Sequence, residues 1–288
     1  MSEGFPETVV QARQRVSELL RQAGIDTPEL DSRLLLQRVT GLAHAQLYLS
    51  GQQPLTASQR QQLDGLLARR LRREPMAYIL GQRAFYDLEL EVTPDVLVPR
   101  PETEALVEAA IAWGGQFARR AWAVDVGTGS GAIALALARH LSATMVAGLD
   151  ISLDALRVAK RNAQRVDVTE RVMLLNSDLL AALREPFALV CANLPYLPTA
   201  ILTQRQPEVR DYEPRLALDG GTDGLVLIRR LCEMLPTRLA KRALVLLEID
   251  QGQGETVSAL LSAVRPGAQI RVLRDYAGYE RVVRAEWL

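Results

Sequence analysis

The chain has 288 residues, of which 48% are hydrophobic and 24% charged, so about two globular domains are expected. No apolar run of 18 residues occurs, which excludes a membrane-spanning helix, and the 34 basic and 34 acidic residues balance to zero net charge, which argues against non-specific duplex DNA binding. Two cysteines in apolar segments and an N-terminus without a secretory pattern indicate a cytoplasmic protein with neither a disulfide nor a metal site.

Residues 1–75 are predicted to form a small all-α domain. Apolar residues recur at helical spacing over 9–23. Another helix is expected after Thr27, where an N-cap, a first-turn proline and an early acid follow one another, and the segment 56–59 resembles a capping box. The basic run 69–73 is expected to be a solvated helix end, with contact to an RNA-rich partner as the alternative. No cluster of catalytic residue types occurs here, so we expect this domain to dock a partner.

Residues 76–98 are predicted to form a β-hairpin linker. The segment 85–92 alternates apolar and acidic residues, as a half-exposed strand does. The Thr-Pro-Asp sequence at 93–95 is typical of a turn, and 96–98 would form a short second strand. This hairpin would connect the helical domain to the rest of the chain.

From residue 99 to 288 strands and helices alternate, which predicts an α/β domain with a mostly parallel sheet covered on both faces. A helix is expected from Pro101 to about Trp113. Strands are expected at 121–126, 144–149, 171–175, 187–192, 242–249, 268–274 and 280–285, and helices at 131–140, 153–165, 222–235 and 254–264. Because only 276–279 separate the last two strands, these strands can pair only in the antiparallel sense. That pair distinguishes the sheet from a plain dinucleotide-binding fold.

A glycine-rich turn follows the first of these strands. Gly127, Gly129 and Gly131 allow a tight turn and a close approach of the backbone to a ligand. Their spacing is Gly-x-Gly-x-Gly, whereas the dinucleotide fingerprint is Gly-x-Gly-x-x-Gly. A nucleotide-like cofactor without a pyrophosphate therefore fits better, and a purely structural turn is the alternative.

Acidic residues follow the next two strands. Asp150 lies about 20 residues beyond the glycine turn, where an acid can accept hydrogen bonds from both ribose hydroxyls of an adenosine. Asp178 is expected to receive an adenine amino group, and its neighbour Leu179 is expected to stack on the ring. Capping of the following helix is the alternative role for either acid, although Ser152 is available to cap the helix after Asp150.

The sequence Asn-Leu-Pro-Tyr at 193–196 is predicted to carry the reaction. A carboxamide nitrogen is a poor nucleophile because its lone pair is delocalised into the carbonyl group. The Asn193 side-chain oxygen and the Leu194 carbonyl can each accept one N–H of a substrate amide and so aim its lone pair at an electrophilic methyl group. Pro195 would fix the turn, and the Tyr196 ring would pack on the planar amide. A plain strand-terminal turn is the alternative.

Five ordered segments of the chain resemble a known family. They are 99–104, 125–131, 212–225, 248–249 and 275–278. Through them nearly the whole chain resembles the HemK/PrmC family, the S-adenosylmethionine-dependent N5-glutamine methyltransferases of peptide chain release factors. The resemblance implies a Rossmann-like, seven-stranded methyltransferase fold, with the last strand pair antiparallel, behind a small helical domain and a β-hairpin linker.

The resemblance also implies S-adenosyl-L-methionine as the cofactor and a release factor as the partner. With the residue patterns above, it gives the expected cofactor-binding set Gly127, Thr128, Gly129, Ser130, Gly131, Asp150, Asp178, Leu179 and Asn193. Residues 193–196 would hold the glutamine of the release factor's Gly-Gly-Gln loop, and Asn193, Pro195 and Tyr196 would be catalytic. The helical domain would help to dock the release factor. We expect a monomer without a membrane partner, a metal or a direct nucleic-acid substrate.

The chain departs from the family pattern at three positions. Leu194 replaces the first proline of the common Asn-Pro-Pro-Tyr pattern, but the contact expected of it uses a main-chain carbonyl that any residue has. Leu179 stands where some relatives carry an aromatic residue, so weaker adenine stacking is expected. Asp250 stands where a glycine often follows Glu-Ile, which affects only a local turn.

Three other functions are weighed against this one. An adenine-N6 nucleic-acid methyltransferase would use a similar segment on a flipped base, but the neutral charge and the lack of a basic recognition domain count against it. A catalytically silent scaffold would have little reason to combine the glycine turn with the sequence at 193–196. An NAD-dependent oxidoreductase is disfavoured by the glycine spacing and by the two histidines, His44 and His140, neither of which belongs to a catalytic set.

Overall fold

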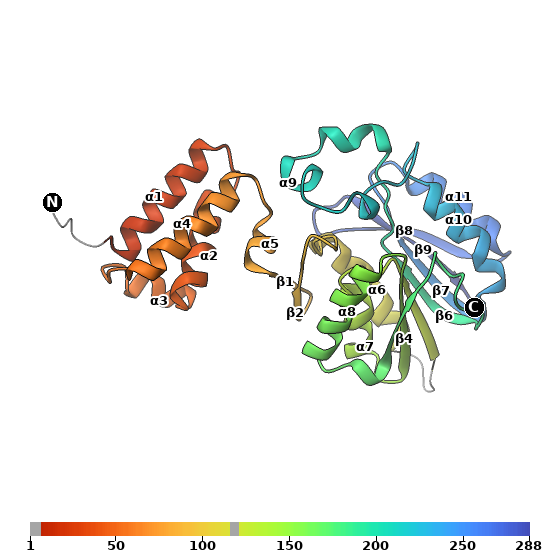
Figure 1. Ribbon diagram of the computed structural model, residues 1–288. Helices are drawn as coiled ribbons and strands as arrows, with labels where there is room; N and C mark the ends of the chain where they lie inside the picture. Colours follow the sequence, from red (N-terminus) through yellow and green to blue (C-terminus); the bar gives the residue numbers. More distant parts are fainter. Residues whose placement is uncertain (1–6, 116–120) are drawn as a thin grey trace, which may run out of the picture. The chain divides into compact units, whose positions relative to one another are not determined.

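The computed structural model describes residues 7–115 and 121–288, which fall into two compact units (Figure 1). The helical unit comprises the chain up to Gly81 and a second segment, Gln206–Tyr212. The sheet unit comprises the rest of the chain. The chain therefore leaves the sheet unit once, contributes a short segment to the helical unit and returns.

The domain division predicted from the sequence is 1–75, 76–98 and 99–288. It stays a prediction, because compactness of a unit does not show which segments fold alone. Residues 1–6, on which the expectation of no secretory signal depends, lie outside the described part of the chain.

The helical unit packs short helices around an apolar core. Its helices are α1 (Val9–Gln22), α2 (Pro28–Thr40), α3 (His44–Leu49), α4 (Ala57–Leu71), α5 (Met76–Leu80) and α9 (Pro207–Arg210). The capping box predicted for α4 is present, because Thr56 and Gln59 each accept a hydrogen bond from the other's backbone N–H. Thr27 is the N-cap residue of α2, but its hydroxyl donates to Asp31 instead of accepting from the helix backbone.

Cations of the basic run at the end of α4 are held by acids of the same unit. The buried Arg70 donates to Asp31 at 2.7 Å and to Glu208 at 2.9 Å, and Arg73 donates to Glu208 at 3.0 Å. Arg69 pairs with Glu74. These ion pairs favour the structural interpretation of the run over RNA contact, and through Glu208 they attach the segment Gln206–Tyr212 to the helical unit.

The hairpin in the sheet unit differs from the predicted one. Its strands are β1 (Gln82–Phe85) and β2 (Leu88–Glu91), so the predictions of one strand across 85–92 and of a second strand at 96–98 were wrong. The predicted turn at 93–95 is present, and the Val96 N–H donates to the Thr93 carbonyl across it at 3.1 Å. The chain turns at Tyr86, which has φ +54° and no standard turn sequence around it. Its N–H donates to Glu104 at 2.9 Å, so a tertiary contact supports the turn.

The sheet has the predicted seven strands. They are β3 (Ala121–Val126), β4 (Thr144–Asp150), β5 (Val172–Asn176), β6 (Phe187–Ala192), β7 (Leu239–Glu248), β8 (Gln269–Arg274) and β9 (Glu280–Trp287). Their order is β5-β4-β3-β6-β7-β9-β8. The first five in this order are parallel, and β9 is antiparallel to both β7 and β8. The predicted fold class, with its antiparallel last pair, is confirmed.

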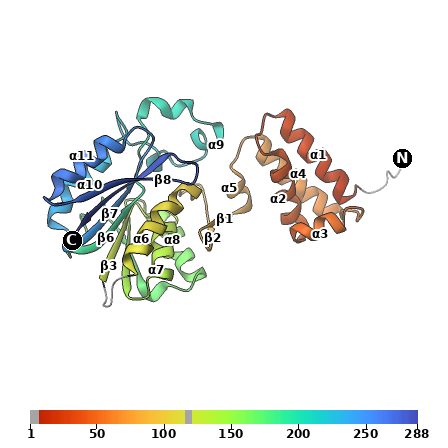
Figure 2. The ribbon, with the colours of Figure 1, turned by 180° about the vertical axis from the view of Figure 1, so that it is seen from behind.

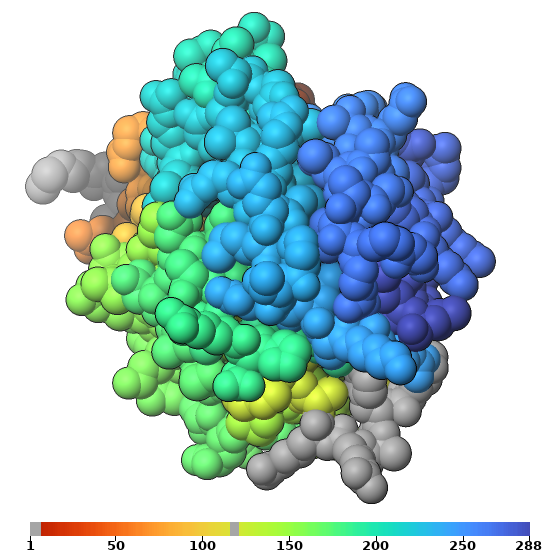
Figure 3. Space-filling model, turned by 90° about the vertical axis from the view of Figure 1, so that its right-hand side faces the viewer, coloured from red at the N-terminus to blue at the C-terminus, as the bar shows by residue number. Residues whose placement is uncertain are grey.

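Helices cover both faces of the sheet (Figure 2). One layer contains α6 (Glu104–Gly114), α7 (Ala132–His140) and α8 (Leu153–Arg165), and the other contains α10 (Val226–Met234) and α11 (Gly254–Val264). Figure 3 shows the face on which α10 and α11 lie side by side. The helix α10 begins later than the predicted residue 222, because Gly221 and Gly224 adopt φ values of +88° and +78° that a helix does not allow. No helix in the described ranges is long and apolar enough to span a membrane.

Candidate active site

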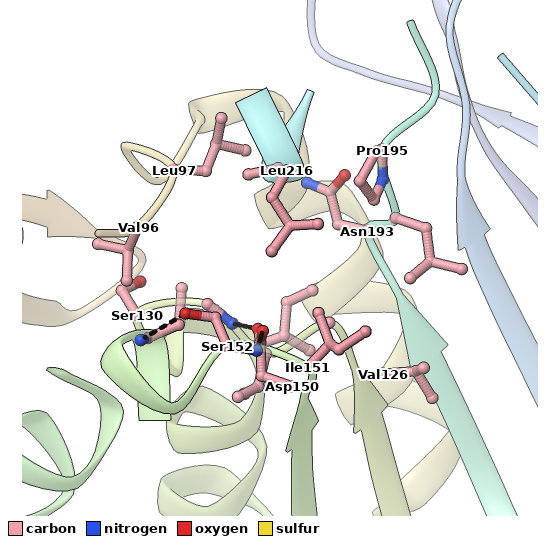
Figure 4. A pocket seen from close by; sticks show the side chains of 18 of the residues that line it. Val96, Leu97, Val126, Ser130, Asp150, Ile151, Ser152, Asn193, Pro195 and Leu216 are labelled. Atoms are coloured by element: carbon pink, nitrogen blue, oxygen red, sulfur yellow. Dashed lines mark hydrogen bonds between the residues drawn. The ribbon is translucent and has the colours of Figure 1, made fainter. Parts of the chain in front are cut away.

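A cavity of about 370 Å³ opens in the sheet unit where four neighbouring parallel strands end (Figure 4). Its floor is made by the residues that follow β3, β4, β5 and β6, the edge at which open α/β sheets bind ligands. Residues 95–103 and 214–217 complete the wall. In Figure 4, Asp150 and Asn193 stand on different sides of the cavity, and Leu97 and Leu216 lie on the side away from Asp150.

The glycine turn after β3 presents its backbone to the cavity. Gly127, Gly129 and Gly131 have φ values of +78°, +55° and +86°, which side chains adopt only with strain. A Cβ on Gly129 would meet nothing within 4 Å, so the cavity is open there. A Cβ on Gly131 would lie 3.3 Å from that of Ala159 in α8, and Gly131 is absent from the cavity wall. Gly129 thus borders open cavity space, and Gly131 packs against the helices.

Asp150 stands at the end of β4 with its carboxylate in the cavity wall. Its Oδ2 accepts the Gly129 N–H at 2.8 Å, and its Oδ1 accepts the Ser152 N–H at 2.9 Å. Burial raises the pKa of Asp150, and these backbone donors oppose that shift. The Ser152 hydroxyl caps α8 by accepting from the Ala155 N–H. Asp150 is therefore not the helix cap, and each of its oxygens keeps acceptor capacity for a ligand.

A second carboxylate, Asp125, supports the glycine turn from below. Its Oδ2 accepts from the Thr128 hydroxyl at 2.7 Å and from the Ala134 N–H at 3.1 Å. Burial raises the pKa of Asp125 to about 7, partly offset by these two donors. Thr128 lines the cavity and Asp125 does not. We infer that Asp125 holds the turn and the start of α7 in place.

Asp178 and Leu179 follow β5 and line the same cavity. The half-exposed carboxylate of Asp178 accepts from Arg230 of α10 at 2.6 Å, so one of its oxygens is already engaged. Leu179 is buried and has φ +49°, a strained value for a leucine. The Ser177 hydroxyl stabilises that conformation by donating to the Leu179 carbonyl at 2.8 Å.

The segment after β6 contributes to the opposite part of the cavity wall. Asn193, Leu194 and Pro195 line it. The Asn193 Nδ2 donates to the hydroxyl of Thr103 at 3.1 Å, and within the described residues no donor reaches the Asn193 Oδ1. The buried Leu194 side chain packs beneath the turn, where a Cβ on Gly127 would lie 3.1 Å from it.

Tyr196 lies behind this segment and is not part of the cavity wall formed by the described residues. Its hydroxyl donates to Oε1 of the fully buried Glu248 at 3.2 Å. Burial raises the pKa of Tyr196, and the charge of Glu248 adds to the shift. The predicted contact of the Tyr196 ring with a substrate amide stays a prediction.

Two glycines fix the position of the segment 193–196 and were not singled out by sequence reasoning. A Cβ on Gly220 would lie 2.6 Å from the Pro195 carbonyl oxygen, and one on Gly224 would lie 2.1 Å from the Tyr196 carbonyl oxygen. Both positions require glycine because backbone packs directly on backbone. The Gly-Gly-x-x-Gly sequence at 220–224 is the signal that could have indicated this close approach.

Sequence reasoning also assigned no role to the residues of the wall that come from 99–104 and 212–218. Arg100 pairs with the buried Glu213, whose pKa is raised by burial and lowered by that arginine. This ion pair joins the two segments, which contribute Thr103, Pro214 and Leu216 to the cavity wall. Both segments carried the family resemblance, but their role appears only when the fold brings them together.

The fold and this site define a class. The model is similar to a methyltransferase from Pyrococcus furiosus with a TM-score of 0.52 and 17% identity over 70% of this chain and 90% of that chain. It is also similar to a 16S rRNA methyltransferase from T. thermophilus in complex with AdoMet and guanosine, with a TM-score of 0.52 and 19% identity over 72% of this chain and 50% of that chain. The fold is that of the S-adenosylmethionine-dependent methyltransferases.

Sequence comparison narrows the class to one family. The family described as PrmC N-terminal domain matches residues 11–81, and the one described as ribosomal protein L11 methyltransferase (PrmA) matches 112–213. The chain is 37% identical to the release factor glutamine methyltransferase of Caulobacter vibrioides over 96% of this chain and 95% of that protein. It is 42% identical to that of Gloeobacter violaceus over 90% of both proteins. The chain belongs to the family of release factor glutamine methyltransferases.

Proposed function

We propose that this protein transfers a methyl group from S-adenosyl-L-methionine to the side-chain amide nitrogen, N5, of the glutamine in the Gly-Gly-Gln loop of peptide chain release factors. The observation that carries the proposal is the Asn193 amide. Its Nδ2 donates to Thr103, and no donor among the described residues reaches its Oδ1. Asn193 lines the cavity that the glycine turn and Asp150 also line. The names of the relatives supply the substrate class.

The residues at the Asp150 side of the cavity fit the cofactor. Gly129 leaves open space beside a backbone that can be closely approached, and Asp150 has acceptor capacity for ribose hydroxyls. Leu179 and Ile151 offer apolar surface for an adenine ring. Asp178 can accept from the adenine amino group with the oxygen that Arg230 does not hold. When bound, the cofactor supplies an electrophilic methyl group on a sulfonium.

The residues at the Asn193 side fit a primary amide. The Asn193 Oδ1 and the Leu194 carbonyl are two neutral acceptors, and each takes one N–H of the substrate glutamine. The nitrogen is then held with its lone pair directed away from both acceptors, and no proton has to be removed to orient it. Pro195 restricts the backbone that follows the Leu194 carbonyl. Tyr196, whose hydroxyl donates to Glu248, supports this segment from behind, and its ring packs on the amide only if the bound substrate reaches past Pro195.

The remaining features of the proposal concern the setting of the reaction. The helical unit docks the release factor, and the match of residues 11–81 to the family described as PrmC N-terminal domain supports this role. The protein acts as a monomer in the cytoplasm, where translation takes place. No membrane and no nucleic acid takes part as a substrate.

The full-length protein and methyl-labelled S-adenosylmethionine test the proposal. Label is expected in an intact release factor and not in the same factor with its Gly-Gly-Gln glutamine replaced. Mass spectrometry of the modified peptide is expected to place one methyl group on the glutamine side chain. Label found in DNA or RNA instead would favour an adenine-N6 methyltransferase, and tight binding of NAD in a calorimetric titration would overturn the cofactor assignment.

A further inference from the structure

Three polar side chains from distant parts of the sequence bear on the proposed amide site: Asn193 donates to Thr103, and the buried Glu248 has one oxygen without a hydrogen-bond partner among the described residues. Asn193 follows β6, Thr103 ends the short helix η1 (Pro101–Thr103), and Glu248 ends β7. Thr103 is 4% exposed and Glu248 is 0% exposed, so water does not satisfy these groups. We propose that Thr103 and Glu248 are positioning residues that fix which end of the Asn193 amide faces the substrate. This inference rests on the proposed function and deepens it.

The orientation of the Asn193 amide decides whether the site works. The oxygen and the NH2 group of a carboxamide are nearly equal in size, so packing alone does not select between them. With Oδ1 toward the cavity, Asn193 accepts an N–H of the substrate glutamine. With Nδ2 toward the cavity, two N–H groups face each other, and the substrate nitrogen is pushed out of place. The protein therefore needs a device that selects one orientation.

The hydroxyl of Thr103 provides that selection if its own proton is committed elsewhere. A hydroxyl has one proton and two acceptor lone pairs. The Asn193 Nδ2 donates to the Thr103 Oγ1 at 3.1 Å, which uses the hydroxyl as an acceptor. The Thr103 proton is then free to be donated to Glu248, whose pKa is raised chiefly by burial and lowered next by this hydroxyl. A Thr103 hydroxyl that donates to Glu248 can only accept from Asn193.

Glu248 can take this proton because its carboxylate has spare acceptor capacity. Its Oε1 accepts from the Tyr196 hydroxyl at 3.2 Å, and its buried Oε2 has no hydrogen-bond partner in the described part of the chain. That oxygen is the acceptor we assign to the Thr103 proton. An ionised carboxylate accepts only, so it makes Thr103 donate and Asn193 turn its NH2 group away from the cavity. Glu248 thus acts on the reaction through Thr103 and without contact to the substrate.

An ionised Glu248 fixes the direction of the hydrogen bonds, from Asn193 to Thr103 and from Thr103 to Glu248. Protonation of Glu248 removes this constraint, because a carboxylic acid can also donate. The charged and titratable groups that face Glu248 are Glu102 beside Thr103, Tyr196 and Arg281 of β9. Burial and the charge of Glu102 raise its pKa and Arg281 lowers it, with the balance at about 7. Turnover is therefore expected to fall as the pH drops through this region, because the Asn193 amide then loses its fixed orientation.

We call this arrangement the relay: Glu248 orients the Thr103 hydroxyl, and Thr103 orients the Asn193 amide. Isosteric variants of the full-length protein test it, with a release factor as the substrate. Thr103→Val removes the hydroxyl and is expected to lower kcat about 10- to 100-fold, the loss that one or two misaligned hydrogen bonds cause. Cofactor affinity, measured by calorimetry, is expected to stay within about threefold. Thr103→Ser keeps the hydroxyl and is expected to retain most of the turnover.

Glu248→Gln tests the direction of the relay. It is expected to lower kcat about 3- to 10-fold at pH 8 and to flatten the fall of kcat at low pH, since no carboxyl group then titrates at this position. The double variant is expected to be no slower than Thr103→Val alone, because Glu248 acts only through Thr103. Additive losses, or a fall of kcat at low pH that persists in Glu248→Gln, overturn the relay.

A measurement without turnover keeps the test separate from the proposed function. Hydrogen exchange of the Asn193 side-chain NH2, followed by NMR with labelled asparagine, is expected to be slow in the wild type and faster in both variants. Asn193→Ala identifies the signal. If the wild type methylates no release factor but the exchange behaves as expected, the proposed function fails and the relay stands. If the wild type is active and Thr103→Val has wild-type kcat and exchange, the relay is wrong.

Discussion

The two sides of the cavity are built by different means. At the Asp150 side, contacts are local: backbone N–H groups of the glycine turn and of Ser152 hold the carboxylate within a short stretch around two neighbouring strand ends. At the Asn193 side, the key contact joins residues 90 positions apart, and the next one joins residues 52 apart. The cofactor side thus depends on backbone conformation, and the amide side depends on the assembly of distant side chains.

This difference between the two sides of the cavity predicts that substitutions on the Asp150 side affect cofactor binding and that substitutions on the Asn193 side affect methyl transfer. Asn193→Ala is expected to have the largest effect. It removes one of two acceptors for the substrate nitrogen, so kcat is expected to fall about 100- to 1000-fold, as when a catalytic hydrogen-bonding group is removed elsewhere. Cofactor affinity is expected to fall less than about fivefold. Single-turnover assays and calorimetry measure the two quantities.

Asn193→Asp is the matched control for this substitution, because it keeps the side-chain shape and an acceptor. It is expected to retain more turnover than Asn193→Ala. Wild-type turnover in Asn193→Ala would remove this side chain from the mechanism and would leave the amide side without its defining residue.

Asp150→Ala is expected to have the next largest effect, and this effect is on cofactor binding. It removes acceptors for the ribose and leaves the Gly129 N–H without its partner, so the Kd for S-adenosylmethionine is expected to rise about 10- to 100-fold. At saturating cofactor, kcat is expected to recover to within about fivefold of the wild type. Asp154→Ala, at an exposed position in the first turn of α8, is the control.

An unchanged Kd in Asp150→Ala would show that this carboxylate only supports the turn. A loss of kcat that saturating cofactor does not restore would show that the two sides of the cavity are coupled. Either result would contradict the proposed division, in which local contacts around Asp150 serve the cofactor and contacts between distant residues around Asn193 serve the substrate amide.

The same difference explains what could be predicted from the sequence. The strand β6, the glycine turn and Asp150 were predicted because each signal is contained in a few adjacent residues. The two-step placement of Thr103 and Glu248 behind Asn193 was not, since nothing in a local pattern tells which strand end will meet which loop. The fold class followed from alternation of strands and helices, and the antiparallel last pair followed from the short connection at 276–279.

Other features could not be predicted because tertiary contacts override local signals. Tyr86 turns the hairpin although it has no turn sequence, since Glu104 holds its backbone N–H. Leu179 adopts a positive φ although leucine disfavours it, since Ser177 holds its carbonyl. The ion pair of Asp178 with Arg230 was not predicted, and the expected ligand contact of Asp178 stays a prediction. For Tyr86 and Asp178 the partner comes from a distant part of the sequence, and for Leu179 it is a side chain two residues away whose role no turn pattern indicates.

A third prediction concerns how the free energy of unfolding depends on pH, because each side of the cavity contains a buried carboxyl group, Asp125 on one side and Glu248 on the other. Burial raises the pKa of Asp125 and that of Glu248 to about 7. At pH values between the pKa that these groups have in the unfolded chain and about 7, the folded protein keeps protons that the unfolded chain releases. Their contribution to the free energy of unfolding is therefore fully present in acid and is lost as the pH rises toward 7, with a slope of up to about 1.4 kcal/mol per pH unit for each group.

Asp125→Asn is expected to reduce this slope, because asparagine can still accept from Thr128 and Ala134 but does not titrate. Denaturant unfolding at pH 5, 6, 7 and 8 measures the slope. Glu248→Gln is expected to reduce it by a similar amount, and the double variant by the sum, because the two carboxyls lie on different sides of the site. A slope that neither variant changes would mean that both groups ionise normally in the folded protein.

The smallest effect is expected where a side chain on the amide side serves only packing. Leu194→Pro gives the pattern common in the family, and it retains the carbonyl that we propose receives the substrate N–H. Turnover is therefore expected to stay within about threefold of the wild type. Stability is expected to fall by about 1 kcal/mol, because the buried Leu194 side chain packs beneath the glycine turn. A 30-fold loss of kcat with unchanged cofactor affinity would instead assign the leucine a direct part in holding the amide, and the assembled side would then depend on this side chain as well as on the relay behind Asn193.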